Sequence, residues 1–121
     1  MAINSYRDIM AWQQAMELVT AVYKFTESWP REEIYGLTGQ VRRAAVSIPA
    51  NIAEEYGRDT RKAYQQFLRI AQGSLKELET HLLIAERLGF SNKEAIAPII
   101  ALSESVGKLL RLLIRKLSEP E

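Results

Sequence analysis

The chain contains no cysteine, and His81 is its only histidine. The absence of cysteine excludes disulfides, thiolate metal sites and cysteine nucleophiles. A di-iron site in a helix bundle needs two Glu-x-x-His pairs and further glutamates, so a single histidine excludes it as well. No serine–histidine–acid set and no glycine-rich phosphate loop can be assembled from the other residues. We therefore expect a protein that is not an enzyme and needs no cofactor or metal ion, with His81 at the surface or at a helix boundary.

Long apolar runs are missing too, because charged residues interrupt the apolar stretches within a few positions. None of these stretches could span a membrane as a helix, which takes about 20 predominantly apolar residues. The N-terminal segment MAINSYRDIMAW has no basic part followed by an apolar one, so it does not resemble a signal peptide. Together with the lack of cysteine, which fits a reducing compartment, these features predict a cytoplasmic protein with no membrane partner.

The chain also has little net charge and no strand pattern. Its 16 lysines and arginines nearly balance its 15 aspartates and glutamates, so a basic surface can arise only from the placement of these residues. Of its 121 residues, 47% are apolar and 26% are charged, which is ordinary for a globular protein. This length is enough for one buried core, and we expect residues 1–121 to form a single domain.

Apolar residues recur at the spacing of an α-helix in four segments. They predict helices at about residues 7–28, 38–57, 60–88 and 91–117. Because the connections are short, neighbouring helices must run antiparallel, and the predicted fold is an all-α, up-down-up-down antiparallel four-helix bundle. The residues expected in its core are Trp12, Val19, Val41, Ile48, Ile52, Leu68, Leu75, Leu82, Leu109 and Leu113.

Local signals place the helix ends and mark two irregular points. Trp29-Pro30 should end the first helix, because the residue before a proline avoids the α region. Ser91 and Glu94 form a capping-box pattern at the start of the fourth helix. Pro49 falls inside the second helix, where a proline costs roughly 3 kcal/mol. Pro98 should bend the fourth helix or divide off its first turn.

A polar stripe runs along the second helix, beside its apolar face and among small alanines. Its members recur every three or four residues and are Gln40, Arg43, Ser47, Asn51 and Glu54. We prefer to interpret it as a subunit interface, in which Arg43 binds a carboxylate and Asn51 satisfies the carbonyl freed by Pro49. A solvated helix face and a direct contact with a ligand or RNA are the other interpretations.

A basic stripe without acidic members follows the third helix, and a second basic cluster lies on the fourth. Surface helices usually mix the two signs, so an acid-free stripe is unusual, although a solvated face is the simplest explanation. Contacts with phosphate groups and pairing between subunits are the alternatives. The candidate nucleic-acid contacts are Arg42, Arg58, Arg61, Lys62, Arg69, Lys76, Lys108, Arg111 and Arg115.

Several segments together resemble one known family in their order and spacing. The most specific are QVRRAAVSIPANIAE, residues 40–54, and GSLKELE, residues 73–79. They resemble the four-helix bundle family that is named for open reading frames in 23S ribosomal RNA intervening sequences, over nearly the whole chain. Glu55 departs from the family pattern, which usually has glycine after Ile-Ala-Glu, and this change favours a longer second helix.

The resemblance implies a homo-oligomeric ring, pentameric in the better-known members, and no known catalysis. The fold is also similar to that of the accessory variability proteins of diversity-generating retroelements. That similarity implies binding to a reverse transcriptase and to nucleic acid. Two functions therefore stand side by side. The first is a non-catalytic homo-oligomer that binds RNA or other nucleic acid through a basic helix face. The alternative is a protein-interaction scaffold or accessory subunit, whose basic residues pair with the acids of a protein partner.

Overall fold

Four long helices form the protein. The structure is a computed structural model that describes residues 5–56 and 60–118, and these residues contain no β-strand. Its α-helices are α1 (Met10–Thr26), α2 (Leu37–Tyr56), α3 (Arg61–Arg87) and α4 (Lys93–Ser118), and its short 3-10 helices are η1 (Tyr6–Asp8) and η2 (Arg31–Tyr35). The all-α prediction is confirmed. The second helix continues through the position where Glu55 replaces the glycine of the family pattern.

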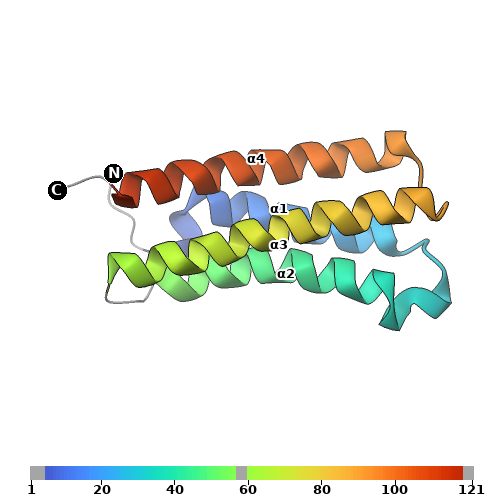
Figure 1. Ribbon diagram of the computed structural model, residues 1–121, viewed down its shortest axis with the longest axis horizontal. Coiled ribbons are helices and arrows are strands. Elements are labelled where there is room, and N and C mark those ends of the chain that lie inside the picture. The colour runs from blue at the N-terminus through green and yellow to red at the C-terminus, as the bar shows by residue number, and fades with distance from the viewer. Residues whose placement is uncertain (1–4, 57–59, 119–121) are drawn as a thin grey trace.

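The helices form an antiparallel bundle with the up-down-up-down order (Figure 1). The first residues of α1 and α3 and the last residues of α2 and α4 lie at the same end. Around the bundle, α2 packs against α1 and α3, and α4 packs against the same two helices. Within the described residues, the backbones of α2 and α4 do not come close to each other, and neither do those of α1 and α3. The predicted four-helix bundle is therefore confirmed.

The turn between α1 and α2 depends on an aromatic cluster and on side-chain caps. Trp29 is buried, and its ring centroid lies 5.9 Å from that of Phe25 and 5.9 Å from that of Phe90, which follows α3. Glu33 accepts a hydrogen bond at 3.0 Å from the backbone N–H of Leu37, the first residue of α2. The helix α1 ends at Thr26, slightly before the predicted Trp29-Pro30 stop.

The connection between α3 and α4 shows one confirmed signal and one correction. Gly89 adopts a φ of 80°, the left-handed conformation that favours glycine after a helix. At the start of α4, the Asn92 side chain accepts a hydrogen bond of 2.8 Å from the backbone N–H of Ala95. Asn92 is therefore the N-cap, one residue later than Ser91, because α4 begins at Lys93. The helix is continuous through Pro98, which does not divide off its first turn.

The core contains most of the predicted residues, but two helices are rotated from the expected position. Val41, Ile48, Ile52, Leu68, Leu75 and Leu82 are buried, as predicted. Trp12 and Val19 of α1, and Leu109 and Leu113 of α4, are only partly buried against this core. The centre of the core is lined instead by their neighbours Ala11, Ala15, Leu18, Val22, Val106, Leu110 and Ile114. In α1 the small alanines face inward because the bundle interior has limited space, and the bulky Trp12 sits at the edge.

We expect Leu75→Ala to lower the free energy of unfolding by roughly 2 to 5 kcal/mol, because it removes a packed side chain that is only 3% exposed. Leu83→Ala is the matched control, since Leu83 lies on the same helix and is 51% exposed. The control should change stability by less than about 0.5 kcal/mol. Urea unfolding at one fixed protein concentration measures both variants. Equal effects of the two substitutions would show that the inner face of α3 is assigned wrongly.

Candidate nucleic-acid interface

A groove of about 620 Å³ lies between α3 and α4. Its lining residues are Gln72, Gly73, Leu75, Lys76, Glu79, Ser103, Glu104, Gly107, Lys108 and Arg111. The groove exists because small residues occupy the facing positions of the two helices. A Cβ atom on Gly107 would lie 3.7 Å from Leu75 and 3.6 Å from the guanidinium of Arg111, so these two side chains lie directly beside the glycine. The groove therefore has an apolar floor and a charged rim.

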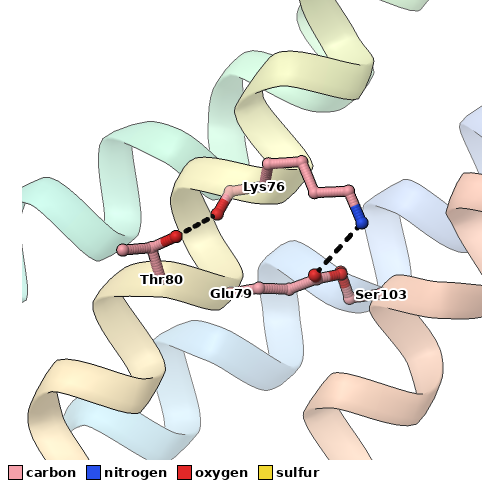
Figure 2. A network of polar contacts seen from close by, with 4 residues as sticks. All are labelled: Lys76, Glu79, Thr80 and Ser103. Atoms are coloured by element: carbon pink, nitrogen blue, oxygen red, sulfur yellow. Dashed lines mark hydrogen bonds and ion pairs between the residues drawn. The ribbon is translucent and has the colours of Figure 1, made fainter.

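One rim of the groove carries a polar network that links α3 to α4 (Figure 2). The Ser103 hydroxyl of α4 donates a hydrogen bond of 2.8 Å to the carboxylate of Glu79 on α3. The other oxygen of Glu79 lies 3.5 Å from the Lys76 ammonium. Ser103 is fully buried and Glu79 is largely buried, so Ser103 fixes the carboxylate. Lys76 is 78% exposed, and such an exposed ion pair contributes little to stability.

Lys108 and Arg111 are two cations of the groove that have no partner among the described residues. Both are exposed, and neither makes a hydrogen bond or an ion pair with another residue of the described ranges 5–56 and 60–118. Glu104, on the same helix, is also exposed and has no such partner there. The groove thus brings together Lys76 from the third-helix stripe with two residues from the fourth-helix cluster, which sequence reasoning treated as separate features.

The remaining candidate contacts are distributed around this groove. Lys62 and Arg69 of α3 are exposed and have no hydrogen bond or ion pair with any other part of the chain that the structure describes. Arg115 of α4 is exposed in the same way and follows Arg111 by one helical turn. Arg61 is exposed but already interacts elsewhere in the chain. The candidate contact Arg58 lies outside the described residues.

Arg42 has a structural position, on a different side of the bundle from the groove. Its Nε donates a hydrogen bond of 2.9 Å to the buried Thr26 hydroxyl, and its Nη2 donates one of 3.4 Å to the Tyr23 carbonyl. The guanidinium also lies 4.6 Å from the centroid of the Tyr23 ring, within range of a cation–π interaction. These contacts hold α2 to the last turn of α1, where a cation also interacts favourably with the helix dipole.

Two members of the predicted polar stripe serve packing inside the subunit. The Ser47 hydroxyl lies 2.8 Å from the Ser74 hydroxyl of α3, so it joins two helices of one chain. The Asn51 amide donates to the carbonyl and the hydroxyl of Ser47, at 2.7 and 3.0 Å. The carbonyl that loses its donor to Pro49 is that of Ala45, four residues earlier in α2. The prediction that Asn51 satisfies the freed carbonyl is therefore wrong.

The other members of this stripe lie on the outer surface of α2. Gln40, Arg43 and Glu54 are exposed, and Glu54 has an interaction within the chain. Arg43 lines a shallow hollow of about 550 Å³ over α2. The hollow is also lined by Tyr23, Ile34, Gly39, Arg42, Val46 and Ser47. Three of these, Tyr23, Ile34 and Val46, are exposed apolar side chains.

Comparisons with known proteins agree with the fold and the motifs. The profile of the 23S rRNA-intervening sequence protein family matches residues 7–112 of the chain. The chain belongs to this family. A crystal structure of a protein of unknown function from the S23 ribosomal protein family of Bacteroides thetaiotaomicron is similar to the chain, with a TM-score of 0.78 and 25% sequence identity. The match covers 88% of this chain and 99% of that one. No curated protein matches the chain.

Neither a membrane-spanning helix nor a metal-binding cluster of side chains is found in the part of the chain that the structure describes. Across residues 5–56 and 60–118, no helix is both long and apolar enough to cross a membrane. The same residues contain no group of three or more His, Asp or Glu side chains that could hold a metal ion. His81 lies within α3 and is partly buried, so the prediction of a surface or helix-boundary position is wrong.

We expect Arg42→Ala to lower the free energy of unfolding by about 1 to 2 kcal/mol, because two hydrogen bonds from a charged donor are lost. Arg69→Ala is the control, since it removes an exposed arginine that has no partner in the described structure. It should change stability by less than about 0.5 kcal/mol. Urea unfolding at a fixed protein concentration compares the two variants. If both arginines prove equally dispensable, Arg42 does not hold α1 to α2.

Proposed function

We propose that this protein is a non-catalytic subunit of a homo-oligomeric ring, a pentamer, that binds RNA or other nucleic acid in the cytoplasm. The groove between α3 and α4 is the proposed contact with the phosphate backbone. The observation that carries this proposal is the convergence of cations from two helices on one groove, with Lys108 and Arg111 uncommitted to other described residues. Family membership supports an RNA context through the name of the family.

The chemistry of the groove favours contact with the backbone over recognition of bases. None of the residues that line it is aromatic, so they provide no ring on which a base could stack. Their net charge is small, because Glu79 and Glu104 oppose the three cations Lys76, Lys108 and Arg111. Repetition of the groove around a ring would add these small charges into a larger positive field. Binding of this kind tolerates different sequences and weakens strongly with salt.

Self-association is proposed to use the outer surface of α2. The hollow there combines exposed apolar side chains, such as Tyr23 and Val46, with the guanidinium of Arg43. Buried apolar area stabilises an interface, and a charged residue at its edge selects the partner surface. Because the backbones of α2 and α4 do not come close to each other within the described residues, this surface and the groove lie on different sides of the bundle. Every subunit of a ring also contributes a second, different surface, and the groove stays accessible if that surface lies elsewhere on the bundle.

A protein-interaction scaffold is the second candidate function, and one contact favours it. Lys76 already pairs with a carboxylate, that of Glu79, at 3.5 Å. The same chemistry would allow Lys108 and Arg111 to bind acidic side chains of a protein partner. This alternative predicts no binding of nucleic acid at low salt, which separates it from the first candidate.

We expect the double charge reversal Lys108→Glu with Arg111→Glu to abolish binding of a labelled single-stranded RNA, measured by fluorescence anisotropy. For the unmodified protein, log affinity should fall with log salt at a slope of roughly −0.7 for each phosphate neutralised. The control is Arg87→Glu with Lys93→Glu, which makes the same charge change at exposed positions outside the groove. Binding that survives the first pair, or that is lost equally with the control pair, would place the contact elsewhere.

We expect sedimentation equilibrium at micromolar protein concentration to show a pentamer. Val46→Asp should shift the protein toward the monomer, because it replaces an apolar contact in the hollow over α2 with a carboxylate, which would also compete with the neighbouring subunit for Arg43. Leu112→Asp is the control, since Leu112 is exposed on α4 and lies outside the hollow. A monomeric unmodified protein would refute the ring. A pentamer that tolerates Val46→Asp but not Leu112→Asp would move the interface away from α2.

A further inference from the structure

The groove between α3 and α4 carries acidic side chains at one end and basic side chains at the other. The two helices are antiparallel (Figure 1), and two hydrogen bonds set their register. Ser103 donates one of 2.8 Å to Glu79, and Gln65 donates one of 2.7 Å to the Ser118 hydroxyl. Positions toward the start of α3 therefore face positions toward the end of α4. The acids Glu79 and Glu104 both lie at the end of the groove that is marked by Ser103.

The cations extend from the groove in one direction only. On α4, Lys108 and Arg111 follow Glu104 by one and two helical turns, and Arg115 lies a further turn along. Arg69 lies on the part of α3 that faces this stretch. These four cations are exposed, and none of them has a hydrogen bond or an ion pair with another described residue. A strand whose phosphates bind along them would enter the groove from its basic end.

No such track continues beyond the acidic end of the groove. The sequence of α3 has no lysine or arginine between Lys76 and Arg87, and that of α4 has none between Lys93 and Lys108. Lys76 itself lies 3.5 Å from the carboxylate of Glu79, so these two charges offset each other. Phosphates that passed this end would meet no further cation until the far ends of the two helices. The charge pattern therefore favours a strand that stops inside the groove.

Glu104 is the acid that remains available at this end. It is exposed and has no partner among the described residues. The oxygens of Glu79 are already occupied, one by the Ser103 hydroxyl and the other by the Lys76 ammonium. A free carboxylate repels phosphate groups and accepts hydrogen bonds from hydroxyl groups. Glu104 therefore suits a part of a nucleic acid that has hydroxyls and no phosphate.

The interior of the groove has room for a terminal sugar and base. Its volume of about 620 Å³ lies within the range of ligand pockets, about 300 to 1,000 Å³. A Cβ atom added to Gly73 would meet nothing within 4 Å among the described residues outside its own stretch of helix backbone. Leu75 provides an apolar floor beside this open space. The carbon atoms of a ribose can pack on such a floor while its hydroxyls face the rim.

We propose that the groove binds the 3′-hydroxyl end of single-stranded RNA. The 2′ and 3′ hydroxyls of the last ribose donate hydrogen bonds to the carboxylate of Glu104, and Lys108 and Arg111 bind the phosphates that precede it. From Glu104 to Lys108 the helix rises about 6 Å, which is comparable to the length of one nucleotide. A 5′-hydroxyl end offers only one donor, and an internal nucleotide has a phosphate on both sides. This inference rests on the proposed binding of RNA in the same groove and adds which part of the strand enters it.

Three RNA oligonucleotides of one sequence test the preference, each labelled with fluorescein at its 5′ end. The first ends in a 2′,3′-diol, the second in a 2′,3′-dideoxynucleotide and the third in a 3′-phosphate. The dideoxy end should weaken binding about tenfold, as for one lost hydrogen bond to a charged group. The 3′-phosphate should weaken it further, because it also brings a negative charge to Glu104. Fluorescence anisotropy at one salt concentration measures the three dissociation constants.

Glu104→Ala tests the assigned acceptor. This variant should bind the diol and dideoxy ends equally, and it should bind the 3′-phosphate end more tightly than the unmodified protein does. The matched control is Glu77→Ala, which removes the same charge from an exposed position on α3 outside the groove. The control should keep the preference for the diol end in full. Both positions are exposed, so neither substitution should affect folding.

The outcomes separate this inference from the proposed function. Equal binding of the three oligonucleotides, still abolished by Lys108→Glu with Arg111→Glu, would overturn the end preference and leave the groove as a contact with the backbone. A preference for the diol end that survives Glu104→Ala would also overturn it, because the hydroxyls would then bind elsewhere. If none of the oligonucleotides binds at low salt, both the inference and the proposed function are wrong.

Discussion

Ser47 and Ser74 bring their hydroxyl oxygens to 2.8 Å across the contact between α2 and α3. Such short side chains can meet only if the two helix backbones approach closely, so this contact fixes the separation of α2 and α3. Asn51 reinforces it by donating to Ser47 from the next turn. Gly73 precedes Ser74 and lines the groove toward α4. The same turn of α3 therefore packs closely against α2 through the Ser74 hydroxyl. On its other side, Gly73 has no side chain to fill the groove toward α4.

Acidic and basic side chains oppose one another in the groove between α3 and α4. Glu79 is largely buried, and it is stabilised by the Ser103 hydroxyl and by Lys76. The carboxylate links α3 to α4, but it also reduces the positive potential available for a phosphate group. Lys108 and Arg111 retain that potential, since they have no such partner in the described structure. Within the groove, Glu79 therefore holds α3 to α4, whereas Lys108 and Arg111 keep their positive charge available.

The sequence predicted the bundle because helical periodicity persists over four segments, and it predicted the central stripe of α3 correctly. Periodicity defines the spacing of a stripe more precisely than its centre. In α1 the prediction therefore centred on Trp12, while the structure turns the smaller Ala15 inward. The groove and the position of Arg42 depend on contacts between different helices, such as that from Arg42 to Thr26, which no local pattern specifies. The basic residues were found, but their assembly into one site was not.

The order of the helices also bears on how the chain folds. Three of the four contacts between neighbouring helices join segments that are consecutive in the sequence. The fourth joins α1 to α4, where Ser105 donates a hydrogen bond of 2.6 Å to Gln14, 91 residues away. Closing this long loop costs more chain entropy than closing any one of the three local hairpins. We therefore expect the seam between α1 and α4 to form last, and the local hairpins favour rapid folding of the rest.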